Sequence, residues 1–132
     1  MRISLSATHC TMKYLYASSI DSLQLHPDNS GSDFTIDLPQ AIEANECALG
    51  GIFYQPHDKE LFVLCDICEA STVRDTTLQI LRLISKPGEM ENLYFIPVTR
   101  KYIQRIRFRI VNRDLTEPTE ALGTVTCVLL LK

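Results

Sequence analysis

Hydrophobic and polar residues alternate along several short segments of this chain. In residues 33–39, Phe34, Ile36 and Leu38 alternate with polar side chains, and residues 105–110 alternate three arginines with three hydrophobic residues. Only an extended chain places every second residue on one face, and only a half-buried sheet requires that alternation. Turn-forming residues separate these segments, and almost no stretch has a helical period. The pattern therefore predicts an all-β protein.

About eight strands are expected from residue 14 onward, separated by turns, as in a sandwich or barrel. The expected strands cover residues 14–20, 34–38, 47–54, 61–68, 77–84, 93–98, 103–111 and 124–131. Pro39 is expected to end the second strand, and Gly50 with Gly51 predicts a bulge in the third. Most connections are longer than a two-residue hairpin turn, which favours a single jelly-roll (Greek-key) β-sandwich over a simple meander.

The inward-facing positions predict the hydrophobic core. Its expected members are Phe34, Ile36, Leu38, Ile106, Phe108, Ile110 and Leu129. Phe62 and Leu64 are expected to join them from the strand 61–68. If that strand has the opposite register, Leu61 and Val63 take their place, because a shift by one residue exchanges the two faces.

Two outward-facing groups are candidates for a subunit interface. The last strand is apolar on both sides, with Val128 and Leu130 opposite its core face, so it is either covered twice or forms a subunit contact. Arg105, Arg107 and Arg109 share the outward face of their strand. Because like charges repel, we expect the arginines to face carboxylates of a neighbouring subunit. A solvated sheet face and contact with packaged DNA remain as alternatives.

Composition and charge narrow the class of protein. The chain has 132 residues, of which 45% are hydrophobic and 22% charged, as expected of one globular domain. We interpret residues 1–13 as an N-terminal arm and 14–132 as the domain. The formal net charge is −3, which argues against a free nucleic-acid binder. We find no apolar run of the roughly 18 residues that suggest a membrane span, and no signal peptide.

The cysteines and the scattered polar residues predict no catalytic, cofactor or metal site. The chain has five cysteines, an odd number that cannot all pair within it, and we read no signal peptide that would direct it to an oxidising compartment. Free buried thiols are therefore expected. Cys65 and Cys68 form a C-x-x-C motif, but no second ligand pair accompanies it, and a strand would turn the two thiols to opposite faces. His57 is expected in a solvated turn. No combination of nucleophile, base and orienting group meets the requirements of an active site, so we predict that the chain is not an enzyme.

The order of motifs along the chain resembles one known family. The segments that carry the resemblance are 14–19, 25–29, 33–39, 65–67 with Glu69, 78–83, 94–98, 105–110, 117–118 and 123–126 followed by Leu129. Together they resemble the single jelly-roll minor capsid, or penton, protein of Polinton/Maverick elements and adintovirus-like viruses. The similarity covers nearly all of the chain from Tyr14 onward.

The resemblance implies a structural virion protein that forms homopentamers at the five-fold vertices of an icosahedral capsid. It implies a double jelly-roll major capsid protein as partner, and assembly in the host nucleus rather than the cytoplasm. It provides no catalytic residue. The alternative is a jelly-roll binding module, derived from a transposon, that recognises a peptide or a glycan. A glycan site requires exposed aromatic residues, whereas most aromatic residues here are expected to point inward.

Overall fold

The computed structural model describes residues 12–56 and 58–132, and this part of the chain contains strands but no helix. The strands are β1 (Lys13–Ser18), β2 (Asp33–Glu43), β3 (Glu46–Phe53), β4 (Leu61–Cys65), β5 (Ser71–Val73), β6 (Thr76–Leu78), β7 (Ile80–Ile84), β8 (Gly88–Glu89), β9 (Ile96–Pro97), β10 (Tyr102–Asn112) and β11 (Thr126–Leu131). Most of the predicted N-terminal arm, the predicted turn residue His57 and the thiol of Cys10 lie outside the described residues.

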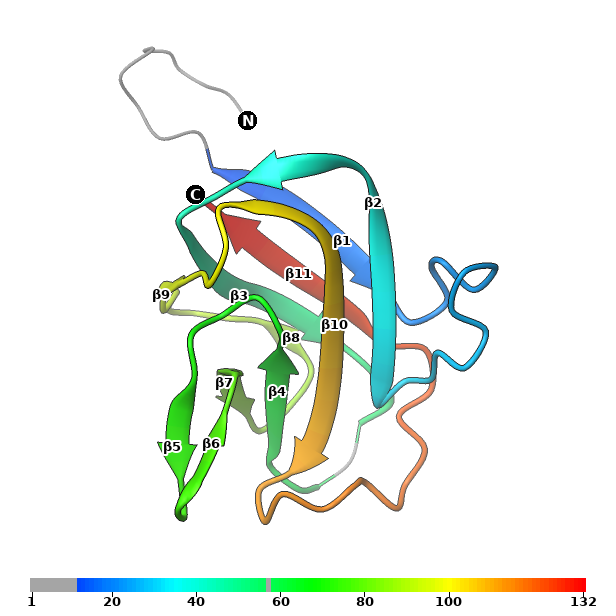
Figure 1. The fold of residues 1–132 in the computed structure, drawn as a ribbon. Helices are drawn as coiled ribbons and strands as arrows, with labels where there is room; N and C mark the ends of the chain where they lie inside the picture. Colours follow the sequence, from blue (N-terminus) through cyan, green and yellow to red (C-terminus); the bar gives the residue numbers. More distant parts are fainter. Residues whose placement is uncertain (1–11, 57) are drawn as a thin grey trace.

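The strands form a jelly-roll sandwich of two antiparallel sheets. One sheet has the order β1-β11-β3-β8, with β9 also paired to β3, and the other has the order β2-β10-β4-β7. The first strand thus pairs with the last, the second with the next to last, and so on inward, as in a long hairpin wrapped around a core. Figure 1 shows the two sheets as facing layers, with β2, β10 and β4 in front of β1, β11 and β3. The predicted all-β jelly-roll fold is confirmed.

Local irregularities fall near glycine and proline, but not always as expected. The bulge predicted at Gly50 is present, because Val128 pairs with Gly51 and Leu129 with Leu49. The prediction that Pro39 ends its strand is wrong, since β2 continues to Glu43. Proline is tolerated there because β2 is an edge strand. Its ladder with β10 is also irregular between residues 103 and 105, opposite the proline.

Several other strand boundaries differ from the predicted ones. The expected strand 77–84 is divided at Gln79 into β6 and β7. The strand expected at 93–98 is reduced to the two residues of β9, and β4 ends at Cys65 rather than Cys68. β5 and β6 pair as a hairpin between the fourth and fifth jelly-roll strands. This β5–β6 hairpin gives the second sheet an additional layer over part of its outer face.

The core between the sheets contains all seven residues predicted for it. Each is at most 7% exposed, and the rings of Phe34 and Phe108 stack with their centroids 5.3 Å apart. Leu61 and Val63 also join this core, so β4 has the second of the two registers considered. Phe62 and Leu64 face outward instead, but they are buried in a small second cluster with Val111. The partly buried Val73 and Leu78 of the β5–β6 hairpin pack against that cluster.

Candidate functional site

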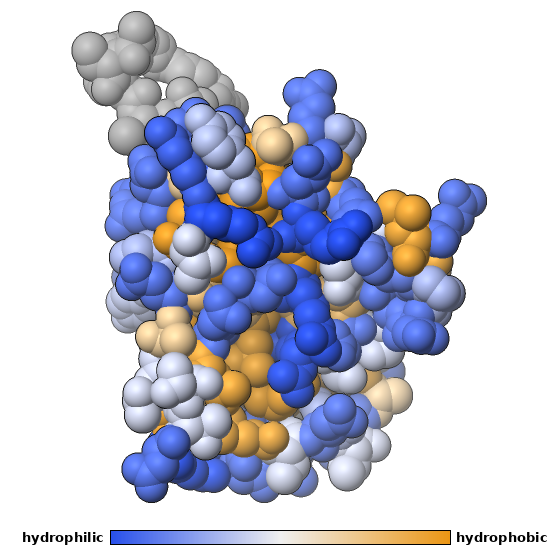
Figure 2. Space-filling model, viewed as in Figure 1, coloured by the Kyte–Doolittle hydropathy of each residue, from blue (hydrophilic) through white to orange (hydrophobic). Residues whose placement is uncertain are grey.

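The predicted arginines lie together on the outer face of the β2-β10-β4-β7 sheet. Ile106 and Phe108 of β10 are fully buried, so Arg105, Arg107 and Arg109 on the alternate positions point away from the core. Figure 2 shows this face, with hydrophilic side chains across its centre and apolar atoms below them. We call the face formed by these three arginines and their neighbours on β2 the charged face.

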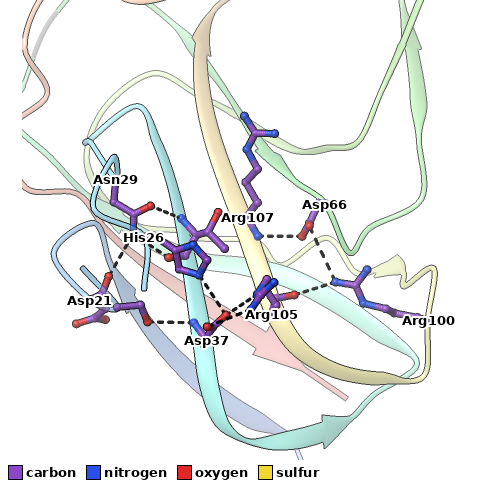
Figure 3. Close-up of polar contacts among 10 residues, drawn as sticks. Asp21, His26, Asn29, Asp37, Asp66, Arg100, Arg105 and Arg107 are labelled. Atoms are coloured by element: carbon purple, nitrogen blue, oxygen red, sulfur yellow. Dashed lines mark hydrogen bonds and ion pairs between the residues drawn. The ribbon is translucent and has the colours of Figure 1, made fainter. Parts of the chain in front are cut away.

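Arg105 is paired with a carboxylate of its own chain. Asp37 lies directly across the ladder from Arg105, and its Oδ1 accepts a hydrogen bond from Nε of Arg105 at 2.6 Å. The hydrogen bond from Arg105 lowers the pKa of Asp37 and is the main cause of that shift. Nε2 of His26 approaches the same Oδ1 to 3.4 Å, so Asp37 sits between two basic side chains (Figure 3).

Arg107 is also paired within the chain, through two parallel hydrogen bonds. Its Nε and Nη2 donate to the two carboxylate oxygens of Asp33 at 2.9 and 2.7 Å, the fork geometry for which arginine is suited. This hydrogen bonding lowers the pKa of Asp33. The backbone N–H of Arg107 donates to Oδ1 of Asp66, the residue that directly follows β4. The charged face is therefore largely neutralised by carboxylates of the same chain, whereas the sequence predicts carboxylates of a neighbour.

Arg109 differs from the other two arginines. Its position is directly opposite Asp33, but Arg107 occupies both oxygens of that carboxylate. Within residues 12–56 and 58–132, no Asp or Glu oxygen lies within 4.0 Å of the Arg109 guanidinium. Its electrostatic effect on Asp33 is the smallest of the causes that shift the pKa of that group. Arg109 thus has charge left for another partner.

A loop between β1 and β2 covers the free edge of β2. The amide side chain of Asn29 donates to the carbonyl of Thr35 at 2.8 Å and accepts from its N–H at 2.9 Å, as a paired strand would. The hydroxyl of Ser22 accepts a hydrogen bond from the N–H of Asp37. These side chains hold Asp37 in place beside His26 (Figure 3). They also occupy backbone groups that would otherwise be open to pairing with another chain.

The second predicted group lies on the opposite side of the sandwich. Val128 and Leu130 are on the outer face of the β1-β11-β3-β8 sheet, so the five predicted interface residues are divided between two faces. Leu130 is only 3% exposed in the single chain. A methyl group added at Gly50 would come within 2.7 Å of Leu130 Cδ1, which shows that this leucine lies flat over the Gly50 backbone. Val128 is partly exposed on the same face.

Two tyrosines on this face were not expected from the sequence. Tyr14 pairs with Leu130 and Tyr16 with Val128 across the β1–β11 ladder, and the two rings are 58% and 66% exposed. Phe53, Tyr94 and Tyr102 are exposed as well, so the prediction that most aromatic residues point inward is wrong. Alternation could have revealed Tyr14 and Tyr16, because Leu15 and Ala17 occupy the inward positions between and beside them. We call Tyr14, Tyr16, Val128 and Leu130 the aromatic face.

Cysteine chemistry provides no alternative site in the described part of the chain. Cys47, Cys65, Cys68 and Cys127 are free and buried. Cys65 ends β4 and Cys68 follows a turn, so both contribute to the main core and not to opposite faces as predicted. Burial raises the pKa of Cys47 and of Cys127 to about 12. Among the described residues, no group of three or more His, Cys, Asp and Glu side chains is arranged to hold a metal ion.

A scan against protein-family models, a search of curated proteins and a search of solved structures each found no match for this chain. In residues 12–56 and 58–132, no helix is long and apolar enough to cross a membrane.

Proposed function

We propose that this chain is a capsid vertex protein that assembles into a homopentamer through its two outer faces. The observation that carries the proposal is the position of the charged face and the aromatic face on opposite sides of one sandwich. A closed ring of identical copies requires a heterologous contact, in which one surface of each copy meets a different surface of the next. Two distinct outer faces meet that requirement.

Two further features support the same function. The strand pairing is that of the jelly roll, a fold common in viral capsid proteins, although lectins and cupins share it. The sequence also resembles the penton family along most of its length. A double jelly-roll major capsid protein is then the expected partner around the vertex, and the virion is the expected location. The resemblance favours assembly in the host nucleus.

Native mass spectrometry and negative-stain imaging of the purified chain test this proposal. We expect pentameric rings. A chain that stays monomeric at all accessible concentrations, or forms a closed two-fold dimer, would contradict it.

Two variants test the contact between unlike faces. Val128→Lys alters the aromatic face, and the double variant Arg105→Gln with Arg107→Gln alters the charged face. Each variant alone is expected to remain monomeric, whereas an equimolar mixture should form heterodimers, because one intact contact survives in the mixed pair. Self-association of either variant alone would show that the contact joins two like faces.

The exposed tyrosines favour a second candidate, a binding module for a glycan or peptide. Tyr14 and Tyr16 present adjacent rings on one strand, and such rings supply large apolar area with a polar tip. A monomer that is stabilised against heat by an added saccharide or peptide, and loses that stabilisation in Tyr16→Ala, would favour this function over capsid assembly.

A further inference from the structure

A hollow on the charged face is lined by Arg109, the one of the three arginines without a carboxylate partner in the described part of the chain. The hollow has a volume of about 190 Å³ and lies between β10, the end of β4 and strand β6 of the β5–β6 hairpin. Arg107 and Arg109 form one wall, and Leu64 and Leu78 contribute apolar surface. It is distinct from the aromatic face, which belongs to the other sheet.

The walls of this hollow are held in position before any ligand arrives. Nε2 of Gln79 donates to the carbonyls of Asp66 and Cys68 at 2.7 and 2.9 Å, which fixes β6 against the turn after β4. Arg107 is fixed by its paired hydrogen bonds to Asp33. A ligand that enters therefore meets a wall held by hydrogen bonds and one arginine, Arg109, whose guanidinium has no carboxylate partner within residues 12–56 and 58–132.

We propose that this hollow binds the side chain of a glutamate from a protein partner. The carboxylate would accept hydrogen bonds from the Arg109 guanidinium, and the hydroxyl of Thr77 at the rim offers a further donor. The methylene groups of the glutamate would lie against Leu64 and Leu78. The hollow combines apolar surface for the methylene groups with a few polar groups that can fix the orientation of the carboxylate, as specific ligand sites do.

The charges around the hollow favour a single carboxylate over a nucleic-acid backbone. Asp66 lines the same hollow, and Asp33 and Asp37 lie along the adjacent strand. A polyanion laid across this face would meet those three carboxylates as well as the arginines, and the net charge of the chain is −3. One isolated carboxylate can reach Arg109 without passing close to all of them.

Nuclear magnetic resonance titration of the full-length ¹⁵N-labelled chain tests the site. The probes are a short blocked peptide with one central glutamate, the same peptide with glutamine, inorganic phosphate and a short duplex DNA. We expect the glutamate peptide to bind about tenfold more tightly than the glutamine peptide, a difference that added salt reduces. The largest amide shifts should fall on residues 64–66, 77–79 and 107–109.

Arg109→Gln keeps a long polar side chain and is expected to lower glutamate-peptide affinity to that of the glutamine peptide. Arg113→Gln is the matched control, because Arg113 pairs with Glu60 outside the hollow and its loss should leave peptide binding unchanged. The variant spectra report directly whether each protein is folded.

Equal binding of the two peptides, no binding at millimolar peptide, or tighter binding of DNA or phosphate than of the glutamate peptide would each overturn the proposal. The titration is made in the Val128→Lys background, which alters only the opposite face and is expected to stay monomeric, so its outcome does not depend on whether pentamers form.

Discussion

Replacing Leu130 with lysine is expected to damage the fold of the single chain before it affects any assembly. Leu130 is 3% exposed and lies over the Gly50 backbone, next to Ala48 in the adjoining strand. Losing a buried leucine removes about 1.5–3 kcal/mol of hydrophobic stabilisation. The ammonium group must still reach water, which lysine achieves by straightening its aliphatic stem and uncovering the surface beneath it.

We therefore expect Leu130→Lys to lower the free energy of unfolding by about 2–4 kcal/mol, within the range of large-to-small changes in protein cores. Most domains of this size are stable by about 5–15 kcal/mol, so the variant should remain folded but unfold at clearly lower urea concentration. Urea denaturation followed by circular dichroism measures the difference.

Val128→Lys is the matched control, because Val128 lies on the same strand and face but is already partly exposed. It should lower the free energy of unfolding by only about 0.5 kcal/mol, as most surface changes do. If the proposed assembly is right, this variant nevertheless loses the ring. Equal stability of Leu130→Lys and the wild-type chain would refute the reasoning, since it would mean that the leucine is not covered within the chain.

Three further outcomes follow from the core, the ion pairs and the thiols. Phe108→Ala should cost about 3–5 kcal/mol in urea denaturation, because it empties a fully buried site stacked on Phe34; a cost below about 1 kcal/mol, typical of surface changes, would contradict the stacking. The pKa of Asp33 is lowered in the folded chain, so its contribution is present above the unfolded value of 3.8 and is lost as the pH falls through the folded value. Asp33→Asn should therefore lose less stability than the wild type on acidification, and identical acid titrations would argue against the Asp33–Arg107 pair. Because burial raises the pKa of Cys47 and Cys127 to about 12, both thiols should react slowly with a thiol reagent at neutral pH and rapidly in denaturant. In denaturant without reductant all five cysteines should titrate as free thiols, and fewer than five would reveal a disulfide.

The sequence predicted the parts of the fold that alternation controls. β10 carries its pattern without interruption from Arg105 to Ile110, so its buried and outward residues could be assigned in advance. β4 has no polar residue from Leu61 to Cys65 and is buried on both faces, so its register could not be read from the pattern. Phe62 and Leu64 are covered as well because the β5–β6 hairpin, together with Ile80 and Leu115, packs on the outer face of the sheet.

The candidate site was only half visible for a similar reason. Arg105, Arg107 and Arg109 could be placed on one face, but their partners belong to β2, about 70 residues earlier in the chain. Which carboxylate faces which arginine depends on the register between β2 and β10. Asp33 and Asp37 occupy outward positions on β2, whose alternation matches that of β10. These positions identify the partners of the arginines only once β2 and β10 are known to be neighbours.

The covered edge of β2 has a consequence for how this protein can accumulate. A sheet edge with open backbone groups can recruit strands from other molecules in any number, and growth of that kind has no natural end. Asn29 and Ser22 satisfy several of those groups from within the chain. A cell could therefore hold a large pool of this protein without that edge seeding fibrils, and association on this side of the sandwich would be left to side-chain surfaces, whose geometry can limit the number of copies.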